Sequence, residues 1–198
     1  FTSSLHPPYD YPDDIFDSGN LKPHELYSTV LYADYALGKF LDLAEKQDYW
    51  NDTVFIVVAD HDTINTSETI PIKSFHIPAF FTGANIQPGK YEKVASQLDL
   101  LPTILSVAGI SSTHPMIGWD LYANNALEKN GRAIMQYNDY HIYMVGNKVV
   151  IHKPGKQPEQ YLYQGKKLIP VDLDSNFEKE ALAHLLWPAK MYLQKLYK

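Results

Sequence analysis

The sequence predicts an α/β fold in which a sheet flanked by helices is followed by a small antiparallel β appendage and a C-terminal helix. Two apolar runs, at residues 53–59 and 77–82, lie between segments with helical spacing, an order typical of an open α/β sheet. After residue 130, short strand-like segments alternate with Asn-Asp and Gly-Asn turns, which favours an antiparallel meander. The 198 residues, 45% of them hydrophobic, can bury a sizeable core.

The first helix follows a Pro- and Asp-rich loop at residues 6–20. Apolar residues then recur every three or four positions, which predicts an amphipathic helix from Pro23 to about Gln47. The run at residues 53–59 lacks polar alternation, so both faces of this strand should be covered, as in a parallel sheet. The second strand ends at Gly83.

Two further helices are expected before residue 110. Residues 91–97 predict a short helix, and Asp99 is placed to cap the next one, which has Pro102 in its first turn and Gly109 as its stop.

The rest of the chain predicts the antiparallel appendage and the final helix. We expect strands at residues 133–137, 141–145 and 148–152, then a helix over residues 177–196 with a kink at Pro188. Residues 1–110 should form the α/β part and residues 111–198 a smaller subdomain of the same domain.

Composition excludes several function classes. The formal net charge of -6 argues against a nucleic-acid partner, because such binding depends on Lys and Arg meeting phosphates. The absence of cysteine excludes a disulfide scaffold, a thiol nucleophile and a Cys-based zinc site. No apolar run approaches the roughly 20 residues of a membrane-spanning helix.

The residues with the most chemical interest follow the first strand. Asp60 and His61 stand at its carboxyl end, where sites form in α/β sheets, and a carboxylate beside an imidazole can ligate a divalent cation. The alternative is a turn cap beside a surface histidine. His6, beside Pro7 and Pro8, is by itself an ordinary loop histidine. No Gly-rich phosphate loop and no Gly-x-Ser-x-Gly elbow occurs.

Several segments together resemble the sulfatase branch of the alkaline phosphatase superfamily, and above all bacterial phosphoglycerol transferases of the lipoteichoic acid synthase type. The segments, in the family's order, are residues 2–9 (TSSLHPPY), 57–61 (VVADH), 75–81 (FHIPAFF), 96–109 (SQLDLLPTILSVAG) and 114–121 (HPMIGWDL). The resemblance implies that Asp60 and His61 are metal ligands and that His6 binds the substrate.

The resemblance starts partway through the family's catalytic domain. The family's nucleophile, a Thr or a modified Cys or Ser, has no match in Thr2, Ser3 or Ser4, and we expect it upstream of Phe1. The chain therefore resembles the C-terminal half of such a domain, whose partner would be the missing N-terminal half. By itself it should be inactive and bind metal weakly, and apolar surface around its first strand should stay uncovered, with self-association a consequence.

The resemblance also implies an activity, a metal and a location. Asp62 stands where sulfatases commonly have Gly, and Lys73 matches their sulfate-binding cation only loosely. Both departures favour transfer of phosphoglycerol or phosphoethanolamine over reaction of a sulfate ester. The expected substrate is lipid-linked or a glycan. Mn²⁺ is the expected cofactor, with Zn²⁺ or Ca²⁺ as alternatives. The parent protein would be anchored by upstream membrane helices, with this domain on the extracytoplasmic (periplasmic) side. A true sulfatase and a non-catalytic α/β binding fragment remain alternatives.

Overall fold

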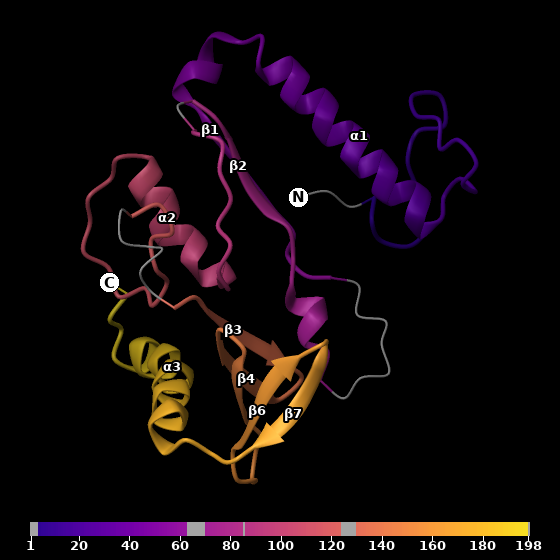
Figure 1. The fold of residues 1–198 in the computed structure, drawn as a ribbon. Helices are drawn as coiled ribbons and strands as arrows, with labels where there is room; N and C mark the ends of the chain where they lie inside the picture. Colours follow the sequence, from indigo (N-terminus) through magenta and orange to yellow (C-terminus); the bar gives the residue numbers. More distant parts are fainter. Residues whose placement is uncertain (1–3, 63–69, 85, 124–129, 198) are drawn as a thin grey trace. The chain divides into compact units, whose positions relative to one another are not determined.

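A computed structural model describes residues 4–62, 70–84, 86–123 and 130–197 (Figure 1). The chain forms two compact units, Phe1–Ile56 with Phe81–Ile86, and Val57–Phe80 with Gln87–Lys198. These units group the segments that pack together and are not a division into domains along the sequence. The division expected at residue 110 therefore stays a prediction. Within the described residues, no helix combines the length and the apolar character that crossing a membrane requires.

The first unit contains the amphipathic helix α1 (Leu26–Ala44) and the short 3-10 helix η1 (Asp48–Asp52). The helix begins three residues after Pro23, because Glu25 and Ser28 form a reciprocal capping box that fixes its start. The loop before it packs against the helix through aromatic rings, with Tyr11 stacked on His24 and on Tyr32 of α1.

The two predicted apolar strands are present as β1 (Val54–Val58) and β2 (Ala79–Gly83), which pair with each other. The Ala59 N–H donates to the Pro78 carbonyl and the Ala84 N–H donates to the Thr53 carbonyl, so the strands run antiparallel. The expectation of a parallel pair buried on both faces is therefore wrong for the described residues. Val58 and Phe80 are exposed, in keeping with the apolar surface expected around the first strand.

The helix expected at residues 91–97 is absent, and only the 3-10 turn η3 (Gln97–Asp99) forms there. Helix α2 (Leu100–Val107) follows it directly and ends before Gly109, whose φ of 71° fits the predicted stop. The Asp99 side chain does not cap α2. It instead closes a capping box with Ser96 around η3, since the Ser96 N–H donates to Asp99 Oδ2 at 2.8 Å.

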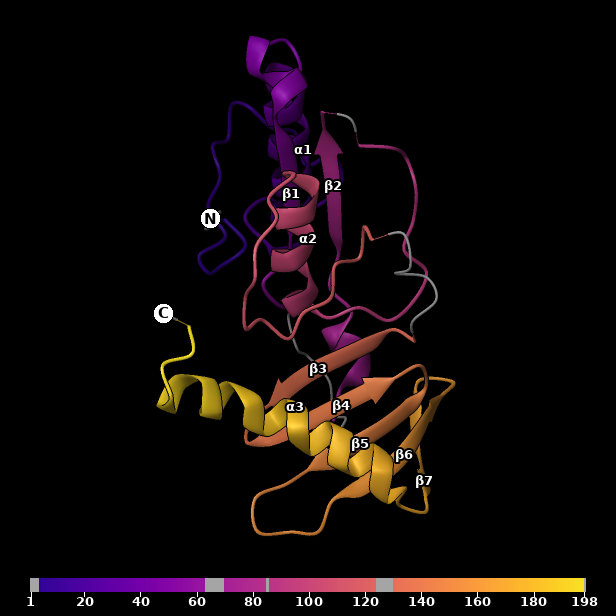
Figure 2. The same cartoon turned by 90° about the vertical axis from the view of Figure 1, so that its left-hand side faces the viewer.

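The antiparallel appendage is larger than the sequence suggested. Its strands pair in chain order into a five-stranded sheet (Figure 2): β3 (Arg132–Tyr137), β4 (Tyr140–Val145), β5 (Lys148–His152), β6 (Glu159–Gln164) and β7 (Lys167–Val171). The first three strands confirm the prediction. The last two were missed because their apolar and polar residues alternate only weakly.

Alternation along β4 and β5 sends side chains into two separate cores. One face packs Ile142, Val149 and Ile151 with Ile72 of the 3-10 helix η2 (Ile72–Phe75). The opposite face packs Tyr143 and Val150 with Phe177 and Ala181.

Helix α3 (Ser175–Leu193) supplies the second core and crosses the face of β3–β5 (Figure 2). The Asp174 side chain caps it by accepting from the N–H groups of Asn176 and Phe177. The helix continues through Pro188 to Leu193.

Candidate functional site

The two predicted metal ligands lie just beyond the end of β1 and point toward each other. His61 Nε2 is 3.7 Å from Asp60 Oδ2, and both side chains are more than 60% exposed. Asp60 Oδ1 accepts the backbone N–H of His61 at 2.9 Å, which fixes the carboxylate plane and leaves Oδ2 as the oxygen facing the ring.

The backbone also selects the tautomer of His61. Its Nδ1 lies 3.0 Å from the carbonyl oxygen of Asp62. A carbonyl oxygen can only accept, so Nδ1 carries the proton in this contact and the neutral ring keeps its lone pair on Nε2. A metal-binding histidine is commonly oriented in this way, by donating its other ring N–H to a carbonyl or carboxylate. Nε2 is the ring nitrogen that lies 3.7 Å from Asp60 Oδ2.

The donor separation fits a shared divalent cation. Two bonds of about 2.1 Å that meet at a tetrahedral angle place their donor atoms about 3.4 Å apart, close to the distance between the two side chains. A mixed nitrogen and oxygen donor set suits Mn²⁺ or Zn²⁺ better than Ca²⁺, which prefers oxygen. In the described part of the chain, no group of three or more His, Cys, Asp or Glu residues is placed to hold a metal ion, so Asp60 and His61 would supply only part of a coordination shell.

The peptide that carries these ligands is held by a residue of η3. Gln97 Nε2 donates to the carbonyl oxygen of Ala59 at 3.2 Å and lies 3.5 Å from that of Asp60. These contacts cross 38 and 37 positions of the sequence. They connect the end of β1 to the turn that starts α2.

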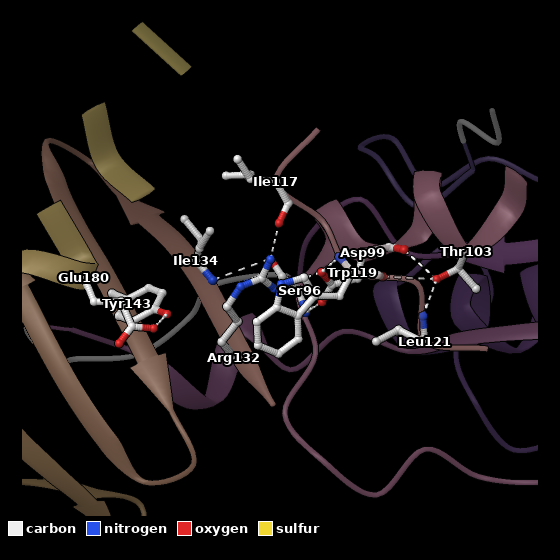
Figure 3. A network of polar contacts seen from close by, with 10 residues as sticks. All are labelled: Ser96, Asp99, Thr103, Ile117, Trp119, Leu121, Arg132, Ile134, Tyr143 and Glu180. Carbon is white, nitrogen blue, oxygen red and sulfur yellow. Dashed lines mark hydrogen bonds and ion pairs between the residues drawn. The ribbon is translucent and has the colours of Figure 1, made fainter. Parts of the chain in front are cut away.

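A buried polar network fixes that turn in place (Figure 3). Asp99 is its centre: besides the Ser96 N–H, its carboxylate accepts the backbone N–H of Trp119 at 2.7 Å and Arg132 Nη1 at 2.9 Å. The Thr103 hydroxyl donates to the Asp99 carbonyl oxygen at 2.6 Å and accepts the Leu121 N–H at 2.9 Å. The segment after α2 is thereby closed back onto η3.

Arg132 connects the network to the five-stranded sheet. It is the first residue of β3, its side chain and that of Asp99 are each 1% exposed, and it also donates to the carbonyl of Ile117. Its guanidinium lies over the Trp119 ring, 4.0 Å from the centroid, which adds a cation–π contact. A buried ion pair with this many partners holds η3, the loop after α2 and β3 together.

Two glycines allow the backbones in this region to approach closely. A Cβ at Gly131 would lie 2.0 Å from the carbonyl oxygen of Val94, and one at Gly118 would lie 2.0 Å from that of Leu98. Real side chains do not tolerate such contacts with backbone atoms. The chain therefore needs glycine where β3 begins and where the loop passes η3.

His6 is described with the first unit. It is exposed, and its carbonyl accepts the N–H of Tyr9 at 2.7 Å, while the carbonyl of Tyr9 accepts the hydroxyl of Thr29 in α1. His6 and the pair Asp60–His61 belong to different units, so their convergence on one substrate stays a prediction.

Sequence reasoning singled out Asp60 and His61, and the structure brings their side chains together. It missed Gln97, Arg132 and Trp119. Gln97 lies inside the resemblance at residues 96–109, yet no spacing rule pairs it with Ala59. The only sequence signal for the burial of Arg132 was its position directly after Gly131, at the start of a strand.

Comparison with known proteins decides the family. The family model described as "Sulfatase" matches residues 1–110, more than half of the chain. This chain belongs to the sulfatase family.

Similar proteins include a choline-sulfatase and a lipoteichoic acid synthase. Lipoteichoic acid synthase of Staphylococcus aureus (strain USA300) is 27% identical over 169 residues, which cover 74% of this chain and 25% of that protein. Choline-sulfatase of Rhizobium meliloti (strain 1021) is 24% identical over 128 residues, which cover 56% of this chain and 24% of that protein. The sulfatase-family chain thus spans about a quarter of the length of these curated relatives.

A solved structure supports the same assignment. A protein in the alkaline phosphatase superfamily from Vibrio parahaemolyticus superimposes with a TM-score of 0.88 and 37% identity, over 100% of this chain and 49% of that one. The fold class is therefore that of the alkaline phosphatase superfamily, with the antiparallel sheet and C-terminal helix as predicted. Members of this superfamily generally use divalent metal ions.

Proposed function

We propose that this chain supplies the Asp60–His61 part of a divalent metal site in an enzyme that transfers or hydrolyses phosphoryl-type esters. The observation that carries the proposal is the 3.7 Å approach of His61 Nε2 to Asp60 Oδ2, with the Nδ1 proton of His61 directed to a carbonyl. Two donor atoms at this distance, one of them on a ring whose other nitrogen is hydrogen-bonded, can bind the same cation. A bound divalent cation would act as a Lewis acid and neutralise charge on the transferring group.

The substrate class follows from the similarities and from two residues. Lipoteichoic acid synthase is among the similar proteins, which supports phosphoglycerol or phosphoethanolamine as the transferred group. Asp62 stands where sulfatases commonly have Gly, and Lys73 matches their sulfate-binding cation only loosely, which favours a phosphoryl group over sulfate. We therefore propose a lipid-linked or glycan substrate, Mn²⁺ as the metal, and an extracytoplasmic location.

His6 would bind the phosphate or glycerol part of the substrate, and the nucleophile would lie outside these 198 residues. Measured on the whole protein, His6→Ala should lower kcat/KM. An unchanged kcat/KM would remove His6 from the site. The isolated chain should show no turnover of a chromogenic phosphodiester with Mn²⁺, because no covalent intermediate can form without the nucleophile.

Metal binding is tested directly on the chain by calorimetry with Mn²⁺. Asp60→Asn and His61→Gln should each weaken Mn²⁺ binding about tenfold or more, because each removes one of two protein donors. The matched control is Asp13→Asn, which disrupts another carboxylate–imidazole pair, Asp13 with His24 at 2.8 Å, and should leave Mn²⁺ affinity unchanged. Equal losses in all three variants would mean surface binding only and would refute the site.

A sulfatase acting on sulfate esters is the second candidate, because choline-sulfatase is also among the similar proteins. Comparing a chromogenic phosphodiester with an aryl sulfate on the whole protein separates the two activities. Faster turnover of the aryl sulfate would replace the phosphoryl assignment, and no turnover of either would favour a binding role.

A further inference from the structure

Gln97 occupies a place where the sheet ladder ends and the proposed metal ligands begin. The Ala59 N–H still donates to the Pro78 carbonyl at 3.1 Å, as the last contact between the β1 and β2 segments. The Ala59 carbonyl points instead to Gln97 Nε2 at 3.2 Å, with the Asp60 carbonyl at 3.5 Å. Both partners are carbonyl oxygens that can only accept, so the amide group of Gln97 must present its NH₂ to them.

We propose that Gln97 is a positioning residue that holds the Asp60–His61 peptide in its metal-binding conformation. This inference rests on the proposed function and assigns to a neutral side chain outside the donor set a role in preparing the site. The two carbonyls flank the Asp60 residue, so fixing them restricts the backbone rotations that aim its carboxylate. The same restriction fixes the position of the His61 backbone, which directly follows the Asp60 carbonyl.

A short, exposed strand end loses order unless another contact replaces the missing hydrogen bonds of the sheet. The side chains of Asp60 and His61 are each more than 60% exposed, so packing contributes little to their order. A donor anchored in a rigid element can replace the ladder. Ordering the ligands before the cation arrives lowers the entropy lost on binding.

The anchor of Gln97 is rigid because of the network around Asp99. Gln97 is the first residue of η3, whose capping box joins Ser96 and Asp99, and Asp99 is locked to Arg132 of β3. The five-stranded sheet is thereby connected to the metal-ligand strand end through one amide side chain. The sheet would serve as the scaffold against which the ligands are held.

The decisive variant is Gln97→Met, which keeps the length of the side chain and removes the donor. Gln136→Met is the matched control, because Gln136 is also exposed and its Nε2 also donates to a backbone carbonyl, that of Asn138 at 3.2 Å. The metal-free measurement is the ¹⁵N order parameter of the Asp60 and His61 amides in the 198-residue chain. We expect it to fall from about 0.85 toward about 0.6 in Gln97→Met and to stay unchanged in Gln136→Met.

The second measurement is the dissociation constant for Mn²⁺ alone, by calorimetry. Gln97→Met should raise it about threefold to tenfold, whereas Gln136→Met should not change it. The thermal midpoint without Mn²⁺ should be nearly the same in both variants, since each loses only exposed side-chain hydrogen bonds. A merely structural role for Gln97 would lower this midpoint without a change specific to Asp60 and His61.

The outcomes separate this inference from the proposed function. Unchanged order parameters in Gln97→Met overturn the positioning role whether or not Mn²⁺ binds. An Mn²⁺ affinity that is lost in Asp60→Asn but retained in Gln97→Met also overturns it and leaves the metal site standing. If Asp60→Asn does not affect Mn²⁺ affinity, the proposed metal site is refuted, and the order parameters still decide the role of Gln97.

Discussion

Removing the carboxylate of Asp99 should be among the most destabilising single changes in this protein. The side chain is 1% exposed and pairs with an arginine that is buried to the same degree, with 2.9 Å between Oδ1 and Nη1 of Arg132. Asp99→Ala would leave the guanidinium charge buried without its counter-ion. It would also strip the backbone N–H groups of Ser96 and Trp119 of their acceptor.

The magnitude follows from the ion pair and the hydrogen bonds that Asp99→Ala removes. Breaking a buried ion pair by removing one partner costs about 3–5 kcal/mol, and hydrogen bonds to a charged acceptor contribute about 1.5–3 kcal/mol each, in terms that overlap. We therefore expect Asp99→Ala to lower the free energy of unfolding by about 4 kcal/mol. For a domain of this size that corresponds to a fall of roughly 8–16 °C in Tm.

The assay is urea unfolding followed by far-ultraviolet circular dichroism, with Asp99→Asn as a milder variant that keeps the shape of the side chain. Replacing both partners, as Asp99→Leu with Arg132→Met, should cost less than the sum of the single changes, by about 2 kcal/mol or more. Glu92→Ala is the control, because the Lys90–Glu92 pair at 3.0 Å is exposed and should contribute under about 1 kcal/mol. A loss below about 1 kcal/mol for Asp99→Ala, or strict additivity of the double change, would refute the reasoning.

Two further predictions concern backbone space and pH. Gly131→Ala should lower the free energy of unfolding by more than about 2 kcal/mol, because the new Cβ would lie 2.0 Å from a backbone carbonyl oxygen. The control Gly38→Ala, within α1, meets nothing within 4 Å and should raise the free energy of unfolding by about 0.5–1 kcal/mol. Denaturant unfolding measures both variants, and equal effects would contradict the close approach of the backbones at Gly131. Burial, together with the nearby positive charge of Arg132, lowers the pKa of His184, which stacks on Tyr143 at 4.9 Å, below its usual value of about 6.5. The folded state then binds fewer protons than the unfolded state, so this contribution to stability should be fully present above about pH 6.5 and fall as the pH drops toward the folded-state pKa of His184. His184→Gln should make the free energy of unfolding less dependent on pH in this range. Parallel pH profiles for the original protein and the variant would refute the role of His184.

The sequence predicted the fold class from particular local signals. The helical spacing after Pro23, the stop at Gly109 and the turns between the first three antiparallel strands are short-range features, and each is present in the structure. The helix expected at residues 91–97 failed because Ser96 and Asp99 use their polar groups to close a tight turn that competes with a longer helix. The prediction that both faces of β1 are buried was wrong, because an apolar run specifies a strand but not which segments cover it.

Local sequence therefore determined most of the elements and the resemblance to the family. It also determined the pair Asp60–His61, because adjacent residues at a strand end are brought near one another by the chain itself. Only the tertiary structure decided the rest of the site's support. Gln97 reaches Ala59 across 38 positions, and Asp99 meets Arg132 across 33. Such contacts depend on how α2, the loop after it and β3 pack together, and on glycines that let backbones approach to van der Waals contact. No local preference encodes that packing, since it is the sum of many weak contacts between segments that are distant in the chain.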